Sequence, residues 1–234
     1  MNKINDGYRH FDHEKFAQSK NPLDFWGQIR RTVNGRSVSE KQISFIVESI
    51  TEALKLKKTD SVLDLACGNG ALSARLFKLC KALHGVDLSE FLVTTAKNHF
   101  ETLPDYTFSE SDLVSFLEAD PNPLIYTKAL CYGSFSYLSE IAANEALCLL
   151  RRRYGNVELI FIGNLPDINL RHRFFKKSTP PDKDLKEHTT AIGIWRSEDE
   201  FVRIARDAGW RVRITRMDRD FYSASYRFDA ILER

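Results

Sequence analysis

The sequence has few of the features that mark membrane, secreted or nucleic-acid-binding proteins. No apolar run approaches the roughly 20 residues of a membrane-spanning helix, and residues 1–6 lack the apolar core of a signal peptide. The net charge of +2 over 234 residues is too small to indicate nucleic acid or an acidic membrane surface as a partner. These absences predict a cytoplasmic protein without membrane insertion and without a nucleic-acid partner.

Cysteine is scarce and shows no pairing pattern. The chain has 4 cysteines, and none of them forms a C-x-x-C pair or stands at zinc spacing to a histidine. They are Cys67, Cys80, Cys131 and Cys148. We therefore expect reduced thiols and no metal site.

The middle of the chain alternates between strand-like and helix-like segments. The expected strands are 61–66, 83–87, 106–109, 124–130 and 157–163. Such alternation is typical of a parallel sheet covered by helices on both faces. The chain is long enough for one such domain with a buried core, and two domains would be a tight fit.

The last third of the chain has a different pattern. Segments 210–215 and 226–232 alternate apolar and polar residues, which predicts an antiparallel pair with one half-exposed face at the sheet edge. Ser39 and Ser197 are each followed three residues later by Gln or Glu, so both read as capping boxes at helix starts.

Two segments stand outside these patterns. Residues 1–38 are polar and aromatic, and we expect them to form an N-terminal cap on a main domain of residues 39–234. Residues 164–196 are rich in Pro, Lys and His and show no clear period. This predicts an insertion or lid within the main domain.

The most informative stretch is a strand that runs into a glycine turn, Val62-Leu63-Asp64-Leu65-Ala66-Cys67-Gly68-Asn69-Gly70. Glycines let the backbone approach a ligand closely, and a helix follows the turn at once. Ser73 stands where a dinucleotide-binding G-x-G-x-x-G loop has its third glycine. The turn therefore indicates a nucleotide-like ligand and disfavours an NAD-dependent dehydrogenase.

Acidic residues follow at the ends of the next two predicted strands. Ligands of open α/β sheets bind outside the carboxyl ends of the strands. Asp87 ends the second strand, where its carboxylate can accept both hydroxyls of a ribose. Asp112 follows the third strand and can accept a hydrogen bond from an exocyclic amine. One such Asp is also typical of a helix N-cap, but three in order predict a nucleoside site.

With these residues in order, residues 39–165 resemble the class I S-adenosylmethionine-dependent methyltransferases. The first motif of that family is an acidic residue, then a small residue and a Gly-x-Gly turn, which Asp64, Ala66, Gly68 and Gly70 match. The resemblance implies a Rossmann-like, seven-stranded, mostly parallel sheet with its last strand antiparallel and helices on both faces. It also implies S-adenosyl-L-methionine as the cofactor.

The resemblance further implies roles in binding the methyl donor. Gly68 and Gly70 pass its methionine part, Asp87 binds its ribose, and Asp112 with Leu113 contacts its adenine. Separately, the arginines that precede the first long helix are candidates to pair with the methionine carboxylate. The predicted donor set is Asp64, Ala66, Cys67, Gly68, Gly70, Asp87, Leu88, Ser111, Asp112, Leu113, Leu130 and Arg36, with Arg30 and Arg31 as alternatives to Arg36.

Transfer from a sulfonium is an in-line displacement, so the protein mainly has to hold the acceptor near the methyl group and exclude water. A general base is needed only where a hydroxyl must lose its proton. His188 is the first candidate because it lies in the predicted lid, and Tyr132 and Tyr137 follow the fourth strand. A surface histidine and two core tyrosines are the ordinary alternative for these residues.

A second resemblance concerns the acceptor. Residues 159–167 and 226–232 resemble the methyltransferases encoded with bacterial surface-polysaccharide enzymes, with Asn164 in place of an Asp. This predicts methyl transfer to a small molecule, in particular to a hydroxyl of a sugar or glycan precursor. An RNA or protein methyltransferase and a non-catalytic donor-binding scaffold subunit are the alternatives. The oligomeric state stays open.

Overall fold

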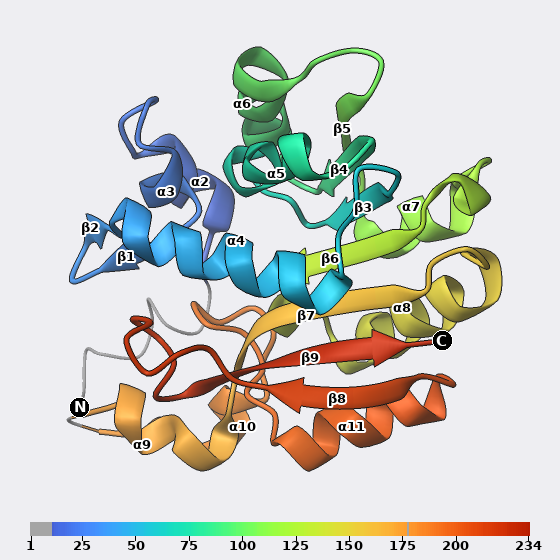
Figure 1. Cartoon of the computed structure of the whole chain (residues 1–234). Helices are drawn as coiled ribbons and strands as arrows, with labels where there is room; N and C mark the ends of the chain where they lie inside the picture. The colour runs from blue at the N-terminus through green and yellow to red at the C-terminus, as the bar shows by residue number, and fades with distance from the viewer. Residues whose placement is uncertain (1–10, 177) are drawn as a thin grey trace.

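A single sheet organises the fold (Figure 1). The computed structural model describes residues 11–176 and 178–234, and within them the sheet has 7 strands in the order β5-β4-β3-β6-β7-β9-β8. The strands are β3 (Ser61–Leu65), β4 (Ala82–Asp87), β5 (Tyr106–Glu110), β6 (Lys128–Tyr132), β7 (Leu159–Pro166), β8 (Arg211–Thr215) and β9 (Arg227–Glu233). The predicted seven-stranded sheet is thereby confirmed.

β9 runs against its neighbours. The pairs from β5 to β7 are parallel, whereas β9 is antiparallel to both β7 and β8. The predicted antiparallel pair at the sheet edge is therefore confirmed, with β8 as its outer strand and β9 as its inner one. β9 lies between β7 and β8, and residues 228–232 are buried, so the half-exposed face predicted for 226–232 is wrong. β8 is the edge strand and exposes Arg211 and Arg213.

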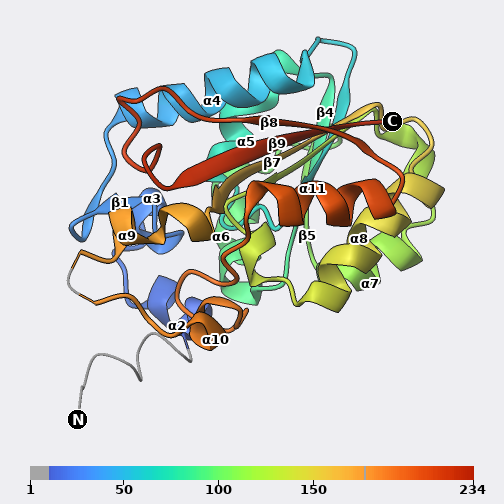
Figure 2. The same ribbon diagram turned by 90° about the horizontal axis from the view of Figure 1, so that it is seen from below.

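Helices cover both faces of the sheet (Figure 2). The helices α4 (Glu40–Leu54), α5 (Ala71–Leu76) and α6 (Glu90–Phe100) pack on one face. On the other face lie α7 (Leu113–Ala119), α8 (Glu140–Arg153) and α11 (Glu198–Asp207). Each face thus buries its own apolar cluster, as expected for parallel strands joined by helical crossovers.

Two further segments add short elements. Before α4 come α2 (His13–Gln18), α3 (Phe25–Gln28) and a small hairpin of β1 (Thr32–Val33) and β2 (Arg36–Ser37). After β7 come η4 (Ile168–Leu170), α9 (Arg171–Phe174) and α10 (Asp182–Leu185). The short turns η1 (Phe77–Leu79), η2 (Pro123–Ile125) and η3 (Phe135–Tyr137) follow α5, α7 and β6. The first ten residues of the predicted cap lie outside the described residues.

The two predicted capping boxes behave differently. The Ser197 hydroxyl accepts a hydrogen bond from the Glu200 amide at 3.1 Å, as the pattern predicts. Ser39 precedes α4 but its side chain makes no capping hydrogen bond. Its partner Gln42 instead binds the loop before β9, donating to the Asp220 carbonyl and accepting from the Tyr222 amide. The two sequence patterns are the same, but at the start of α4 Gln42 makes a tertiary contact and the capping box does not form.

The fourth strand begins later in the chain than predicted. The apolar pattern of 124–130 suggested a strand from Leu124, but Leu124 and Ile125 are exposed in η2 and the strand begins at Lys128. The strand therefore ends at Tyr132, so the residues that follow it are Gly133 and Ser134.

No helix in the described parts of the chain is long and apolar enough to cross a membrane.

Candidate functional site

The turn after β3 has a backbone that suits close approach of a ligand. Ala66, Gly68 and Gly70 all have positive φ, at 57°, 61° and 73°. A Cβ on Gly68 would lie 2.9 Å from Ile29 Cγ2, and a Cβ on Gly70 would lie 2.8 Å from Phe108 Cζ. Both positions therefore require glycine, for conformation and for space.

Asp87 at the end of β4 holds this turn in place. One oxygen of its carboxylate accepts a hydrogen bond from the Gly68 amide at 2.7 Å, and the other accepts one from the Ser89 amide at 3.0 Å. Burial raises the pKa of Asp87, while these amides oppose the rise. Each carboxylate oxygen can accept a second hydrogen bond, so both remain able to take a ligand hydroxyl. The adjacent Leu88 is 70% exposed.

Asp64 lies beneath the turn, out of contact with solvent. The Ser73 hydroxyl donates to its carboxylate at 2.6 Å, and burial raises the pKa of Asp64 to about 7. Ser73, which replaces the dinucleotide glycine, thus has a specific partner here. Cys67 is also buried, and a Cβ on Gly85 would lie 2.8 Å from its sulfur. Cys67 therefore packs the underside of the turn.

The residues after β5 form the start of a helix. The Asp112 carboxylate accepts hydrogen bonds from the Ser115 amide and hydroxyl, at 3.0 and 3.1 Å, so it caps α7. The Ser111 amide donates to the Asp87 carbonyl at 3.0 Å, which ties this strand end to the previous one. Leu113 is buried in the core. The structure thus brings Asp87 and Ser111 together and gives Asp112, which is exposed, a capping contact.

Arg31, and not Arg36, is the arginine at the strand ends. Arg36 is exposed in β2. Arg31 is buried, donates to the Tyr132 carbonyl at 2.9 Å, and lies so near Gly133 that a Cβ there would meet its Nη1 at 2.6 Å. Its charge also lowers the pKa of Asp64, against the effect of burial. The choice of Arg36 is therefore corrected, because the β1–β2 hairpin turns that residue toward solvent.

The structure places Leu130 within the core. It is fully buried in the cluster under α4, and its main chain is paired with Asp64. Because β6 continues two residues further, Leu130 does not reach the strand end. Ser134 does, and its hydroxyl donates to the Ala66 carbonyl at 3.3 Å.

The three residues predicted for catalysis lie in different places. His188 has a side chain 43% exposed, and its Nδ1 is 3.0 Å from Glu187. The Tyr137 hydroxyl donates to the Ala191 carbonyl at 3.1 Å. Tyr132 is buried beside Phe161, and its hydroxyl has no hydrogen-bond partner. His188 therefore faces solvent, while the two tyrosines line the end of β6.

Residues of the N-terminal segment lie over these strand ends. The Asn69 side-chain amide donates to the Phe25 carbonyl and to Gln28, at 2.8 and 2.7 Å. The His13 ring lies 4.4 Å from that of Tyr137, and its Nε2 is buried without a partner. Burial lowers the pKa of His13 to about 4, and the nearby Arg30 charge adds to this effect.

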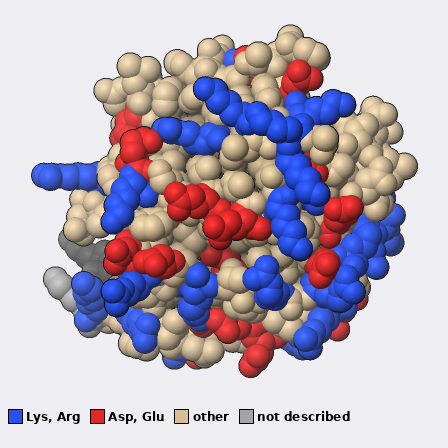
Figure 3. All heavy atoms as spheres, viewed as in Figure 1, with Lys and Arg blue, Asp and Glu red and all other residues tan. Residues whose placement is uncertain are grey.

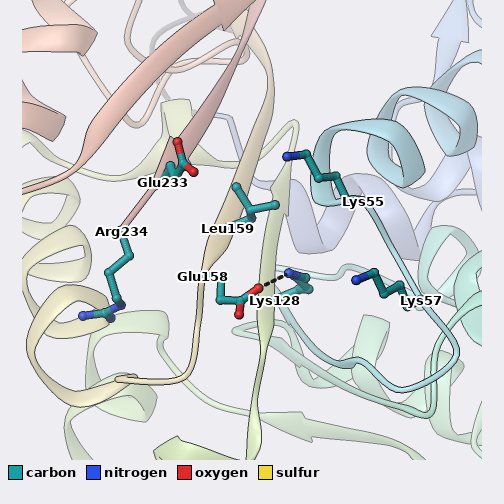
Figure 4. Close-up of a pocket in the computed structure, with 7 residues that line it drawn as sticks. All are labelled: Lys55, Lys57, Lys128, Glu158, Leu159, Glu233 and Arg234. Carbon is teal, nitrogen blue, oxygen red and sulfur yellow. Dashed lines mark hydrogen bonds and ion pairs between the residues drawn. The ribbon is translucent and has the colours of Figure 1, made fainter.

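A hollow of about 440 Å³ lies at the other end of the strands, where the parallel strands begin (Figure 4). Its lining residues lie at the starts of β6 and β7, at the end of the reversed strand β9, and in the turn that follows α4. They are Lys55, Lys57, Lys128, Glu158, Leu159, Glu233 and Arg234. Lys128 is buried and pairs with Glu158 at 2.8 Å. This hollow is therefore separate from the glycine turn. No cluster of three or more potential metal ligands occurs in the described residues.

Comparison with known proteins agrees with this geometry. Residues 62–153 match the methyltransferase domain family. A ubiquinone biosynthesis O-methyltransferase of Coxiella burnetii is 33% identical over 94 residues, which are 40% of this chain and 38% of that protein. A ribosomal RNA small subunit methyltransferase A of Synechococcus is 33% identical over 70 residues, covering 30% and 26% of the two chains. The chain thus spans between about a quarter and two fifths of the length of the curated relatives that it matches.

The solved structures extend the likeness to the whole sheet. An S-adenosylmethionine-dependent methyltransferase from Clostridium acetobutylicum superposes with a TM-score of 0.66 at 13% identity, covering 91% of this chain and 99% of that one. At this identity the match establishes the fold. Residues 62–153 are therefore a class I S-adenosylmethionine-dependent methyltransferase domain, and the sheet around them has the fold of that class.

Proposed function

We propose that this chain, which carries a class I S-adenosylmethionine-dependent methyltransferase domain, methylates a hydroxyl of a small polar acceptor, with a sugar as the favoured class. The acceptor oxygen bonds to the methyl carbon as the carbon–sulfur bond breaks, and S-adenosylhomocysteine leaves. The hydroxyl proton passes to a base or to solvent. Such a displacement depends on alignment and exclusion of water more than on covalent help from the protein.

The observation that carries the proposal is the contact between the glycine turn and Asp87. A 2.7 Å hydrogen bond brings the Gly68 amide and the Asp87 carboxylate together, with oxygen lone pairs to spare. This suits a donor whose methionine part crosses the turn and whose ribose meets Asp87. Arg31, whose Nε is buried without a partner, would pair with the methionine carboxylate.

The acceptor would enter between two segments that meet over the strand ends. The Phe11 amide donates to the Thr189 carbonyl at 3.0 Å, and Tyr137 reaches Ala191 from the end of β6. We propose that the segment before α4, which the structure describes from Phe11 on, is a cap on the domain of residues 39–234. The predicted lid, 164–196, would begin only at Asp167, because residues 164–166 belong to the buried strand β7. Closure of both would keep water away from the transferred methyl group.

Two observations bear on the acceptor atom and class. The first relative is named as an O-methyltransferase, which supports oxygen as the atom methylated. Another acts on ribosomal RNA, which keeps RNA as the second candidate. In Figure 3, Lys and Arg are interspersed with Asp and Glu on one face of the molecule. A phosphate backbone requires clustered cations, so the mixed charge favours a small acceptor.

Calorimetry with S-adenosylhomocysteine and with NAD tests the donor site. We expect binding of the first and not of the second, and the reverse result would overturn the proposal. Transfer of a labelled methyl group to a panel of sugars, sugar acids, phenols and ribosomal RNA then tests the acceptor. Label on RNA alone would replace the small-molecule acceptor with the second candidate.

A further inference from the structure

A second polar cluster lies at the ends of β6 and β7 and the start of β9, beside the proposed donor site. The Asn164 amide donates to one oxygen of Asp229 at 2.6 Å, and Asn164 Oδ1 accepts from the Ser223 hydroxyl at 3.0 Å. Arg227 donates to the Asn164 carbonyl. A Cβ on Gly163, the residue before Asn164, would clash with the Tyr132 ring, so this ring lies beside the cluster. Burial and the charge of Asp229 raise the pKa of the Tyr132 hydroxyl, while the charge of Arg227 lowers it. Three adjacent strands thus contribute polar groups to one place.

An irregularity in β7 builds this cluster. Asn164 is buried at φ 65°, and the pairing with β9 shifts register between Ile162 and Leu165. Such bulges redirect backbone groups and are common beside functional sites. Here the bulge turns the Asn164 amide to Asp229, which leaves the second oxygen of Asp229 free.

Three polar atoms of the cluster are buried and have no hydrogen-bond partner. They are the Tyr132 hydroxyl, Arg227 Nε and Asp229 Oδ2. Tyr132 is 4% exposed and Asp229 is 1% exposed. Proteins seldom leave buried polar groups unsatisfied, and three in one cluster point to a ligand. No ion pair joins Arg227 to Asp229 among the described residues, although they are two positions apart on one strand.

The three unpartnered groups define the chemistry of a ligand that would satisfy them. Arg227 Nε and the Tyr132 hydroxyl are donors, which suit a carboxylate. Asp229 Oδ2 is an acceptor when ionised, which suits a hydroxyl. Resting on the proposed function, we infer that the acceptor is a hydroxy acid, with its carboxylate bound by Arg227 and Tyr132 and a hydroxyl bound by Asp229. A sugar acid satisfies both requirements.

The loop of residues 216–226 packs against this cluster, where the Ser223 hydroxyl donates to Asn164 Oδ1. Phe221 and Ser223 of the loop are buried, and Gln42 of α4 binds the main chain at Asp220 and Tyr222. The loop must lift for the acceptor to enter, and Gln42 is the contact that it must release.

Matched ligand pairs test the inference. Protein saturated with S-adenosylhomocysteine is titrated with D-glucuronate and D-glucose, and with 4-hydroxybenzoate and phenol, at millimolar concentrations. We expect the acid of at least one pair to bind with a Kd about tenfold or more below that of its neutral partner. Equal binding within both pairs, or no binding by either acid, overturns the inference.

Variants separate recognition from folding. Arg227→Gln should abolish the preference for the acid, Arg227→Lys should retain part of it, and Arg213→Gln on the exposed edge strand should leave it unchanged. Unchanged affinity for S-adenosylhomocysteine in each variant shows that the fold is intact. Persistence of the acid preference in Arg227→Gln would refute the role of this arginine. Failure of the parent protein to bind S-adenosylhomocysteine would instead remove the proposed function.

Discussion

Asp87 has a structural role in the glycine turn and a proposed role in binding the donor. Its carboxylate holds the Gly68 and Ser89 amides, and in the proposed site it also takes the donor ribose. Asp87→Asn removes the charge and one acceptor, so affinity for S-adenosylhomocysteine should fall by about 1.5–3 kcal/mol, the value of a charge-assisted hydrogen bond. Calorimetry measures the loss.

Asp199→Asn is the matched control for Asp87→Asn. Asp199 is exposed in the first turn of α11 and is not part of the proposed donor site. We expect little change in donor affinity. An equal loss in both variants would contradict a special role of Asp87.

Asp64 makes the stability of the protein depend on pH. Its pKa is raised to about 7 in the folded chain from 3.8, because burial disfavours the carboxylate. The folded state therefore holds this proton more tightly than the unfolded state does. The contribution is fully present below pH 3.8 and is lost as pH rises through about 7.

Asp64→Asn tests this dependence, since Asn can still accept the Ser73 hydroxyl. We expect the Tm of the parent chain, relative to that of the variant, to fall between about pH 5 and pH 8. A difference in Tm that stays constant over this interval would show that Asp64 does not titrate there.

Some residues of the candidate site could be predicted from the sequence and others could not. The glycine turn with Asp64 before it and Asp87 after it could be predicted, because these residues follow one another along the chain at the ends of successive strands. The identity of the buried arginine, Arg31, could not be predicted. Three arginines lie close together in the sequence, and the β1–β2 hairpin determines which of them is buried. That choice depends on tertiary packing against Gly133.

At the scale of elements, the two predicted capping boxes provide an internal comparison. Ser197→Ala removes a 3.1 Å hydrogen bond to the Glu200 amide, and should destabilise the fold by about 1 kcal/mol. Ser39 makes no capping hydrogen bond, so Ser39→Ala should cost much less. Chemical denaturation of both variants gives the two free energies. Equal costs would mean that Ser39 caps α4 in solution.

The strands show why element type is easier to predict than element position. Alternation identified 226–232 as a strand, yet nothing in its pattern reveals that it lies between β7 and β8. In the alternating pattern of 226–232, Asp229 falls at a position predicted to face solvent. In the fold Asp229 accepts a hydrogen bond from the main-chain amide of Asn164 at the β7 bulge. Long-range pairing of this kind has no local sequence signal.

For the whole molecule, contacts join the proposed cap to the proposed lid. Besides the Phe11–Thr189 hydrogen bond, Arg30 donates to the Ala191 carbonyl, and its guanidinium lies 4.2 Å from the Phe11 ring. His13 is packed between the rings of Phe11 and Tyr137. The two segments are far apart in sequence, so their meeting over the strand ends could not be predicted from either alone.

This closure should weaken in mild acid. The pKa of His13 is lowered to about 4 when the cap is docked, against 6.5 for a free histidine, because burial and Arg30 oppose protonation. As pH falls from 6.5 toward 4, the undocked cap binds a proton that the docked cap rejects. Docking is therefore favoured above this interval and is progressively lost below it. Hydrogen exchange of the α2 amides, corrected for intrinsic rates, should rise between about pH 7 and pH 5.

His13→Phe keeps a ring between Phe11 and Tyr137 but cannot take a proton, so it should remove the acid-dependent part of the exchange. His172→Phe provides the control, because His172 is exposed on α9 and is not one of the packed rings of Phe11, His13 and Tyr137. If the acid-dependent exchange persists in His13→Phe, another group governs the cap. If it disappears in both variants, the effect comes from overall charge, and the link between His13 protonation and access to the strand ends is refuted.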